Sequence, residues 1–348
     1  MKYSIITLIL LLTVACNSQS KKTDIPNTNT LDSKKTDIQI GEYVTSITED
    51  VNGNLWFGTI NKGIAVYNGH TLTYYTKENG LPSNRVIGML EDAKGTNWLI
   101  TGAGLTAYNG KGFTNYTTNN GLNSNSISNL FIDSKGIFWV GTWEGVYTFT
   151  QEKFTPFPLP KPKVQTPINP DTENWITDIT EDSKGNIWFA RDGYGASVYN
   201  GTSFKHYTTD DGLNSNNVQS IVEDAKATIW IGTRVAEKDN PDPNKRTGNG
   251  GLNKYDGTKI VHFPTLKGLN KNDVYSIYKS PSGTIWISTI SNGIYKYQNK
   301  KFTNIKVPKA IMSMYEDKNS NLWLGCAGGL YKITPKGDIL NITTEGPW

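Results

Sequence analysis

Short stretches of alternating apolar and polar residues recur along the chain, and each copy contains a tryptophan in the same frame. These tryptophans are Trp56, Trp98, Trp139, Trp188, Trp230, Trp286 and Trp323, at spacings of 42, 41, 49, 42, 56 and 37 residues. A period of roughly 40–45 residues is that of a four-stranded propeller blade. The pattern therefore predicts an all-β fold, a seven-bladed β-propeller of four-stranded antiparallel blades, over residues 39–345.

Each repeat reads as four short strands. The first copy contains VTSI, the turn EDVNG, the tryptophan strand LWFGT, the glycine-initiated GIAVYNG and the aromatic strand TLTYYT. Alternation with β-branched and aromatic residues, interrupted by N-G and D-G turns, is typical of antiparallel strands. We expect the repeat tryptophans to pack between neighbouring blades rather than to serve as sugar platforms. The E-D-x-x-G-x-x-W turns resemble sialidase Asp boxes only loosely, and we expect their aspartate to belong to the structural turn.

The N-terminus reads as a targeting segment. Residues 1–15 are predicted to be a lipoprotein signal peptide, because Lys2 precedes an apolar run at 5–14 that is too short to span a bilayer. The sequence TVAC, ending at Cys16, resembles a bacterial lipobox, which implies cleavage before Cys16 and its lipidation, including palmitate. The alternative is an ordinary secretory signal with an incidental cysteine. Residues 16–38 are polar, carry SKKTDI twice, and are predicted to be a flexible tether behind the lipidated cysteine.

Composition argues against several classes of protein. The net charge is +4, and lysines and arginines are mixed with acids throughout. This pattern indicates a solvated surface and no nucleic-acid partner. Only Cys16 and Cys326 exist, so lipidation of the first leaves no disulfide. The chain has no zinc motif, phosphate loop or serine elbow. We therefore expect no metal and no cofactor, and we expect a monomer that meets the membrane only through its lipid anchor.

The blade consensus carries a family resemblance. The string V-x-S-I-x-E-D-x-x-G-x-x-W-x-G-T-x-x-x-G-L/I-x-x-Y, clearest at 44–67 and 218–233, resembles the two-component regulator propeller repeat. Such repeats are typical of the extracytoplasmic sensor halves of hybrid histidine kinases in Bacteroidota, which are associated with polysaccharide sensing. The chain departs from those sensors, because it shows one propeller where they usually have two, no transmembrane helix after residue 15 and no kinase region. We therefore expect no phosphotransfer by this chain.

Two insertions interrupt the repeat, at 156–174 and 234–250, and account for the two long tryptophan spacings. Propeller geometry places both on the same face around the channel mouth. Long loops in a compact domain are often functional; the alternative is tolerated surface insertion. The candidate ligand-binding residues are those that break the repeat on this face, and they are Arg85, Trp143, Glu144, Trp175, Arg191, Asp192, Tyr194, Arg234 and Asp273.

Arg191 stands where most other blades have threonine. Two interpretations remain open. Its guanidinium could be a fork for a carboxylate or sulfate, or it could form an internal ion pair with Asp178 or Asp192. The histidines His70, His206 and His262 are predicted to lie away from this face, so we do not expect them to act as bases.

These observations predict a non-catalytic recognition module of the envelope, for a glycan or a protein partner and linked to polysaccharide sensing. One alternative is a polysaccharide lyase-like enzyme that uses Tyr194 and Arg191 at the channel mouth; another is an assembly scaffold. The expected location is the outer membrane. By the same family resemblance, an acidic run after the lipidated cysteine marks surface export, and here Asn17, Ser18 and Gln19 follow instead. The periplasmic face is therefore preferred over the cell surface.

Overall fold

The computed structural model describes residues 39–164, 171–234, 250–263, 269, 273–344 and 346–347. The chain divides into two compact units, Met1–Thr36 and Asp37–Trp348. The predicted signal peptide, Cys16 and tether lie outside the described residues, so the account below concerns the second unit. None of the helices within the described ranges is long and apolar enough to cross a membrane.

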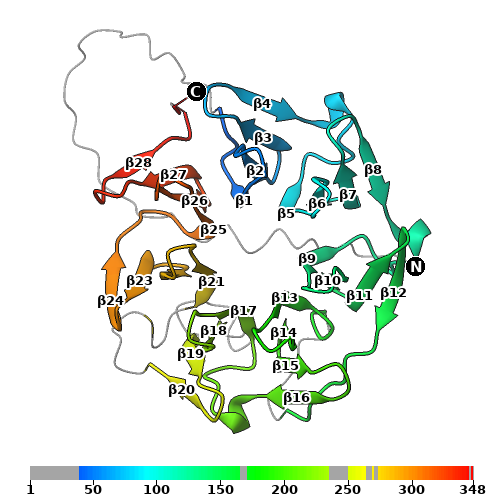
Figure 1. Ribbon diagram of the computed structural model, residues 1–348, viewed down its shortest axis with the longest axis vertical. Helices are drawn as coiled ribbons and strands as arrows, with labels where there is room; N and C mark the ends of the chain where they lie inside the picture. Colours follow the sequence, from blue (N-terminus) through cyan, green and yellow to red (C-terminus); the bar gives the residue numbers. More distant parts are fainter. Residues whose placement is uncertain are drawn as a thin grey trace, which may run out of the picture. The chain divides into compact units, whose positions relative to one another are not determined.

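Seven four-stranded antiparallel sheets surround a common centre (Figure 1). In every sheet the strands pair in the order of the chain, and the first strand of each blade lies innermost. The predicted seven-bladed propeller is therefore confirmed. Every blade is built from four consecutive strands, so the ring closes without an exchange of strands between the first and last blades.

The first four blades contain sixteen strands. Blade one comprises β1 (Val44–Glu49), β2 (Leu55–Thr59), β3 (Ile64–Tyr67) and β4 (Leu72–Tyr75). Blade two comprises β5 (Val86–Glu91), β6 (Asn97–Thr101), β7 (Gly104–Tyr108) and β8 (Phe113–Tyr116). Blade three comprises β9 (Ile127–Ile132), β10 (Phe138–Thr142), β11 (Gly145–Thr150) and β12 (Lys153–Phe157). Blade four comprises β13 (Ile176–Glu181), β14 (Ile187–Arg191), β15 (Gly195–Tyr199) and β16 (Phe204–Tyr207).

The other three blades complete the ring. Blade five comprises β17 (Val218–Glu223), β18 (Ile229–Thr233), β19 (Gly251–Tyr255) and β20 (Ile260–His262). Blade six comprises β21 (Val274–Lys279), β22 (Ile285–Thr289), β23 (Ile294–Gln298) and β24 (Lys301–Ile305). Blade seven comprises β25 (Ile311–Glu316), β26 (Leu322–Cys326), β27 (Gly329–Ile333) and β28 (Ile339–Asn341). Three short 3-10 helices follow outer strands, at Lys77–Asn79, Thr118–Asn120 and Thr209–Asp211.

The repeat tryptophans form the packing between blades, as the sequence predicts. Their exposed fractions run from 0% at Trp230 to 9% at Trp98. Trp56 stacks on Tyr75 of its own blade, with ring centroids 6.1 Å apart, and contacts Tyr108 of the next blade at 5.8 Å. Each large ring thus fills the space between two twisted sheets, where its apolar surface is buried from solvent.

The turn aspartate fixes the tryptophan in six blades. Its Oδ2 accepts a hydrogen bond from the indole Nε1 at 2.8–2.9 Å. In blade five, Asp224 Oδ1 also accepts bonds from the backbone N–H groups of Lys226 and Thr228, at 2.8 and 3.0 Å. One carboxylate therefore closes the turn and orients the ring. Blade six has Ser280 in this position, and Trp286 Nε1 is buried there without a hydrogen-bond partner.

The glutamate before that aspartate joins neighbouring blades. Glu181 accepts bonds from the backbone N–H and the hydroxyl of Ser134 in the preceding blade's turn, at 2.7 and 2.8 Å. Glu223 binds Ser183 in the same way, at 2.8 Å for both bonds. In blade two, Glu91 accepts a bond from Val51 N at 2.7 Å. The E-D pair thus has two functions, one between blades and one within a blade.

Replacement of the turn aspartate in blade five tests this role. We expect Asp224→Ala to lower the free energy of unfolding by about 2–3 kcal/mol, because it removes three hydrogen bonds and leaves a buried indole N–H unsatisfied. Denaturant unfolding of the full chain measures the effect. Ser280→Ala is the matched control in blade six, where no such bond exists, and should cost less than about 1 kcal/mol. Equal losses in the two variants would contradict the role assigned to the aspartate.

Candidate functional site

An ion pair joins blades four and five on the face that carries the two insertions. Arg234 Nη2 lies 2.8 Å from Asp192 Oδ1, with exposed side-chain fractions of 14% and 11%. Asp192 Oδ2 accepts a further bond of 2.6 Å from the hydroxyl of Thr172, in the insertion before blade four. Asp192 follows directly after β14 and Arg234 directly after β18, which are equivalent positions in adjacent blades. Two predicted site residues are therefore in direct contact.

Two tryptophans outside the repeat frame stack beside this ion pair. Trp143 follows β10 and Trp175 precedes β13, and their ring centroids are 4.7 Å apart at an interplanar angle of 20°. The guanidinium of Arg234 lies over the Trp175 ring, 4.9 Å from the centroid, in cation–π geometry. Trp175 Nε1 is buried without a hydrogen-bond partner. Blades three, four and five therefore meet in one cluster of rings and charges.

Arg191 forms the buried part of the same face. Arg191 is the last residue of β14, and it is 2% exposed. Nη1 donates to the carbonyl oxygen of Pro160 at 2.7 Å, and the guanidinium lies 4.7 Å from the centre of the Tyr194 ring. Burial lowers the pKa of Arg191 to about 10. Of the two interpretations of Arg191, the internal ion pair is wrong, because Asp192 pairs with Arg234 and Asp178 is bound elsewhere.

Asp178 joins three blades beside the central channel. Its Oδ1 accepts bonds from Ile179 N at 2.9 Å and from Asn129 Nδ2 at 3.1 Å, and its Oδ2 accepts a bond from Ile221 N at 2.8 Å. The residue is half-buried. Burial therefore raises the pKa of Asp178 to about 6, although these hydrogen bonds oppose the shift.

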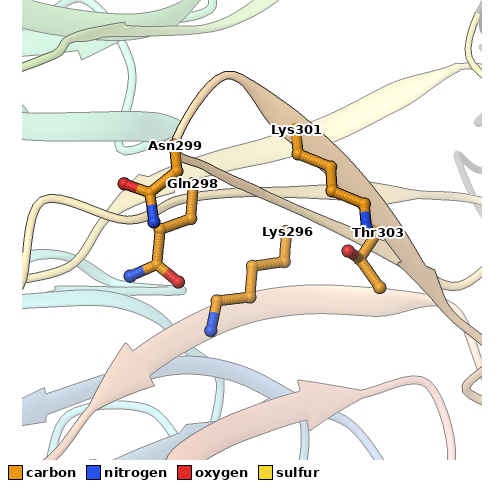
Figure 2. Close-up of a pocket in the computed structure, with 5 residues that line it drawn as sticks. All are labelled: Lys296, Gln298, Asn299, Lys301 and Thr303. Carbon is orange, nitrogen blue, oxygen red and sulfur yellow. The ribbon is translucent and has the colours of Figure 1, made fainter.

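A hollow of about 180 Å³ opens between blades three and four. Its lining includes Glu144, Asn174 and Arg191 as polar groups and Phe157 and Leu159 as apolar groups. Glu144 and Asn174 face each other in an isolated parallel bridge between the two blades. A second hollow, of about 300 Å³, lies on the β23–β24 hairpin of blade six and is lined by Lys296, Gln298, Asn299, Lys301 and Thr303 (Figure 2). No predicted site residue lines that second hollow.

By direct contacts the structure joins Trp143, Trp175, Asp192 and Arg234 into one group. It pairs Arg191 with Tyr194. Glu144 lines the hollow between blades three and four together with Arg191. Arg85 lies exposed at the start of blade two, where its carbonyl accepts a bond from Gly102 N at 2.9 Å. Asp273 is half-buried in the equivalent position of blade six.

Several residues that contact the candidate site lie in the first insertion, and the repeat pattern did not predict them. The Thr172 hydroxyl donates to Asp192, and the Pro160 carbonyl oxygen accepts from Arg191. Lys161 pairs with Glu173 at 3.0 Å, and its ammonium lies 5.4 Å from the centre of the Tyr194 ring. Their only signal in the sequence was membership of the insertion. The segments 165–170 and 235–249 of the two insertions lie outside the described residues.

The three histidines and Cys326 do not line the hollow between blades three and four. His206 lies on the outer strand β16, where its Nδ1 is 2.9 Å from the Ser197 hydroxyl. Burial, and secondarily the charge of Arg191, lower its pKa. His70 lies in the turn between β3 and β4, and His262 ends β20. Cys326 is fully buried, and burial raises its thiol pKa to about 12, which suits a core residue better than a nucleophile.

Five segments of the chain match the family model described as two component regulator propeller, at residues 39–61, 121–144, 171–190, 212–234 and 268–291. The chain carries two component regulator propeller repeats. This confirms the resemblance predicted from the blade consensus. Three of the segments, ending at residues 144, 190 and 234, reach into or up to the cluster described above.

Similar proteins include a curated relative and solved structures. Histidine kinase P4 of Formosa agariphila is 26% identical over 178 residues, which cover 46% of this chain and 12% of the kinase. The extracellular domain assigned to hybrid two component system BT3049 of B. thetaiotaomicron superposes with a TM-score of 0.65 at 24% identity, over 83% of this chain and 39% of that one. An inactive variant of virginiamycin B lyase from Staphylococcus aureus, with quinupristin, gives a TM-score of 0.65 at 13% identity, over 87% and 97%. The two structural likenesses show the fold alone.

The ion pair between blades four and five can be tested by removal of its acid. We expect Asp192→Ala to lower the free energy of unfolding by about 3 kcal/mol, because it leaves the Arg234 guanidinium without its carboxylate in a largely buried place. The control is Glu173→Ala, which breaks the Lys161 pair, exposed by 36% and 44%, and should cost below about 1 kcal/mol. Denaturant unfolding measures the free energy of unfolding of both variants. A smaller loss of stability for Asp192→Ala than for Glu173→Ala would contradict this account.

Proposed function

We propose that this propeller is a non-catalytic recognition module of the cell envelope and that it binds a glycan at the blade three to five cluster. One observation carries the proposal. Blades one, two and six end their second strand with threonine and form the same fold without residues of this cluster, so packing of the ring does not require these residues. Stacked aromatic rings beside charged and amide groups are the side chains that suit a polyhydroxylated ring.

The relatives support a sensing role. The repeats are those of the two component regulator propeller family, and the chain resembles part of a histidine kinase and the extracellular domain assigned to a hybrid two component system. In such systems an extracellular domain reports a ligand to a separate signalling region. A chain with this propeller fits the part that recognises the ligand. The proposed protein partner and the scaffold role are outcomes that the following test separates.

A panel of polysaccharides titrated against the full chain tests the proposal by calorimetry. We expect at least one to bind, and we expect Trp143→Ala to weaken that binding at least tenfold, because it removes one ring of the Trp143–Trp175 stack. Tyr74→Ala is the matched control, since Tyr74 is 37% exposed on the outer strand of blade one. An equal loss in the control, or capture of one stoichiometric protein without any polysaccharide binding, would reject glycan recognition.

The lyase alternative is tested in the same samples. Tyr194 is 8% exposed, with a guanidinium over its ring, and its hydroxyl would have to reach a substrate from this enclosed position. Formation of unsaturated sugar ends is followed by absorbance with uronic-acid polysaccharides. We expect no turnover. If turnover occurs and Tyr194→Phe abolishes it, the protein is an enzyme and the proposal of a non-catalytic module is wrong.

We further propose that Cys16 carries the lipid that holds the chain on the outer membrane, facing the periplasm. The apolar run at 5–14 and the TVAC sequence support lipidation, and the neutral residues 17–19 support the periplasmic face. Cells fed labelled palmitate should label the wild-type chain but not Cys16→Ser, because the thiol is the site of attachment. Unlabelled wild-type chain in the soluble fraction would reject the anchor, and digestion by protease added to intact cells would reject the periplasmic face.

A further inference from the structure

We infer that the hollow beside Arg191 is a carboxylate subsite that receives the acidic group of a uronic acid residue. The inference rests on the proposed glycan recognition and specifies the class of sugar. It depends on three features of the described residues, which are the state of Arg191, the contrast with neighbouring cations, and the lining of the hollow.

The first feature is a buried positive charge without an acidic partner. The Arg191 side chain is 2% exposed, and neither ion pair formed within the described ranges includes it. Its hydrogen bond to a protein acceptor is the one from Nη1 to Pro160 O, and Nε is buried with no hydrogen-bond partner. A guanidinium has five N–H donors, and burial of such a charge without compensation is costly. An anion that enters the hollow supplies the missing acceptors.

The second feature is the contrast with the other cations of the cluster. Arg234 is paired with Asp192 at 2.8 Å, and Lys161 is paired with Glu173 at 3.0 Å. Both of these charges are therefore compensated within the protein. Arg191 differs because a tyrosine ring and one carbonyl oxygen hold its plane in place without neutralising it. Such a fixed, planar fork matches the two oxygens of a carboxylate.

The third feature is the size and lining of the hollow. Its volume of about 180 Å³ is below the roughly 300–1,000 Å³ of sites for whole drug-sized ligands, so it suits one sugar residue of a longer chain. Phe157 and Leu159 provide apolar walls, while Glu144 and Asn174 provide hydrogen-bonding groups besides Arg191. Glu144 accepts hydrogen bonds from hydroxyl groups but repels a second anion. The lining therefore favours a residue with a single acid and several hydroxyls.

The test compares two small glycosides that differ at one carbon. Methyl glucuronide has a carboxylate where methyl glucoside has a hydroxymethyl group, and both are titrated against the full chain by ligand-observed NMR. We expect the glucuronide to bind at least tenfold more tightly, and added salt to weaken it. Arg191→Thr, which restores the residue found in most other blades, should abolish the preference. Because threonine fits this position elsewhere in the ring, this variant should still fold, and its thermal unfolding checks that it does.

Lys301→Gln provides the matched control, because it removes one positive charge from the other hollow (Figure 2). It should leave the preference for the glucuronide unchanged. Equal binding of the two glycosides, or a preference that persists in Arg191→Thr, would overturn the carboxylate subsite. Tighter binding of glucoside 6-sulfate than of the glucuronide would do the same. These outcomes are distinguishable from failure of the proposed function, because polysaccharide binding that depends on Trp143 would stand without any role for Arg191.

Discussion

The hydrogen bond from the tryptophan indole to the turn aspartate orders six of the seven blades. It fixes a large ring in the wedge between two blades, and the same carboxylate closes the turn that connects the two inner strands. Neither part would be well placed alone, because a ring of this size needs one orientation and a tight turn needs its N–H groups satisfied. Repetition of this unit at a constant spacing produces blades of the same geometry, and the ring follows.

Residues that repeat from blade to blade could be predicted from the sequence, whereas the contacts of residues that occur once could not. The repeated tryptophan, turn and glycine positions each have a local physical reason, so seven copies of the signal predict seven blades. The choice of partner for a single side chain has no such repetition. The sequence left Arg191 free to pair with Asp178 or Asp192, and only the fold shows that Asp192 pairs with Arg234. Pro160 and Thr172 were missed because an insertion has no register from which their neighbours could be inferred.

The candidate site consists of residues that the ring does not need. Arg191 stands in a position where threonine suffices, and Trp143 and Trp175 lie outside the tryptophan frame. Their contacts are nevertheless ordered by the fold, because the ends of adjacent second strands meet on one face. The propeller therefore supplies position, while the departures from its consensus supply chemistry.

The glutamate bridges between blades are unevenly distributed around the ring. Ile132 and Lys279 occupy the glutamate position in blades three and six, so the junctions of blade two with three and of blade five with six lack this carboxylate. Blades three, four and five, in contrast, are joined by Glu181, Glu223 and Asp178. Glutamate bridges thus join blade three to four and blade four to five, and these three blades carry the aromatic and arginine cluster. A ligand bound at that cluster would therefore contact three blades that carboxylates already join to one another.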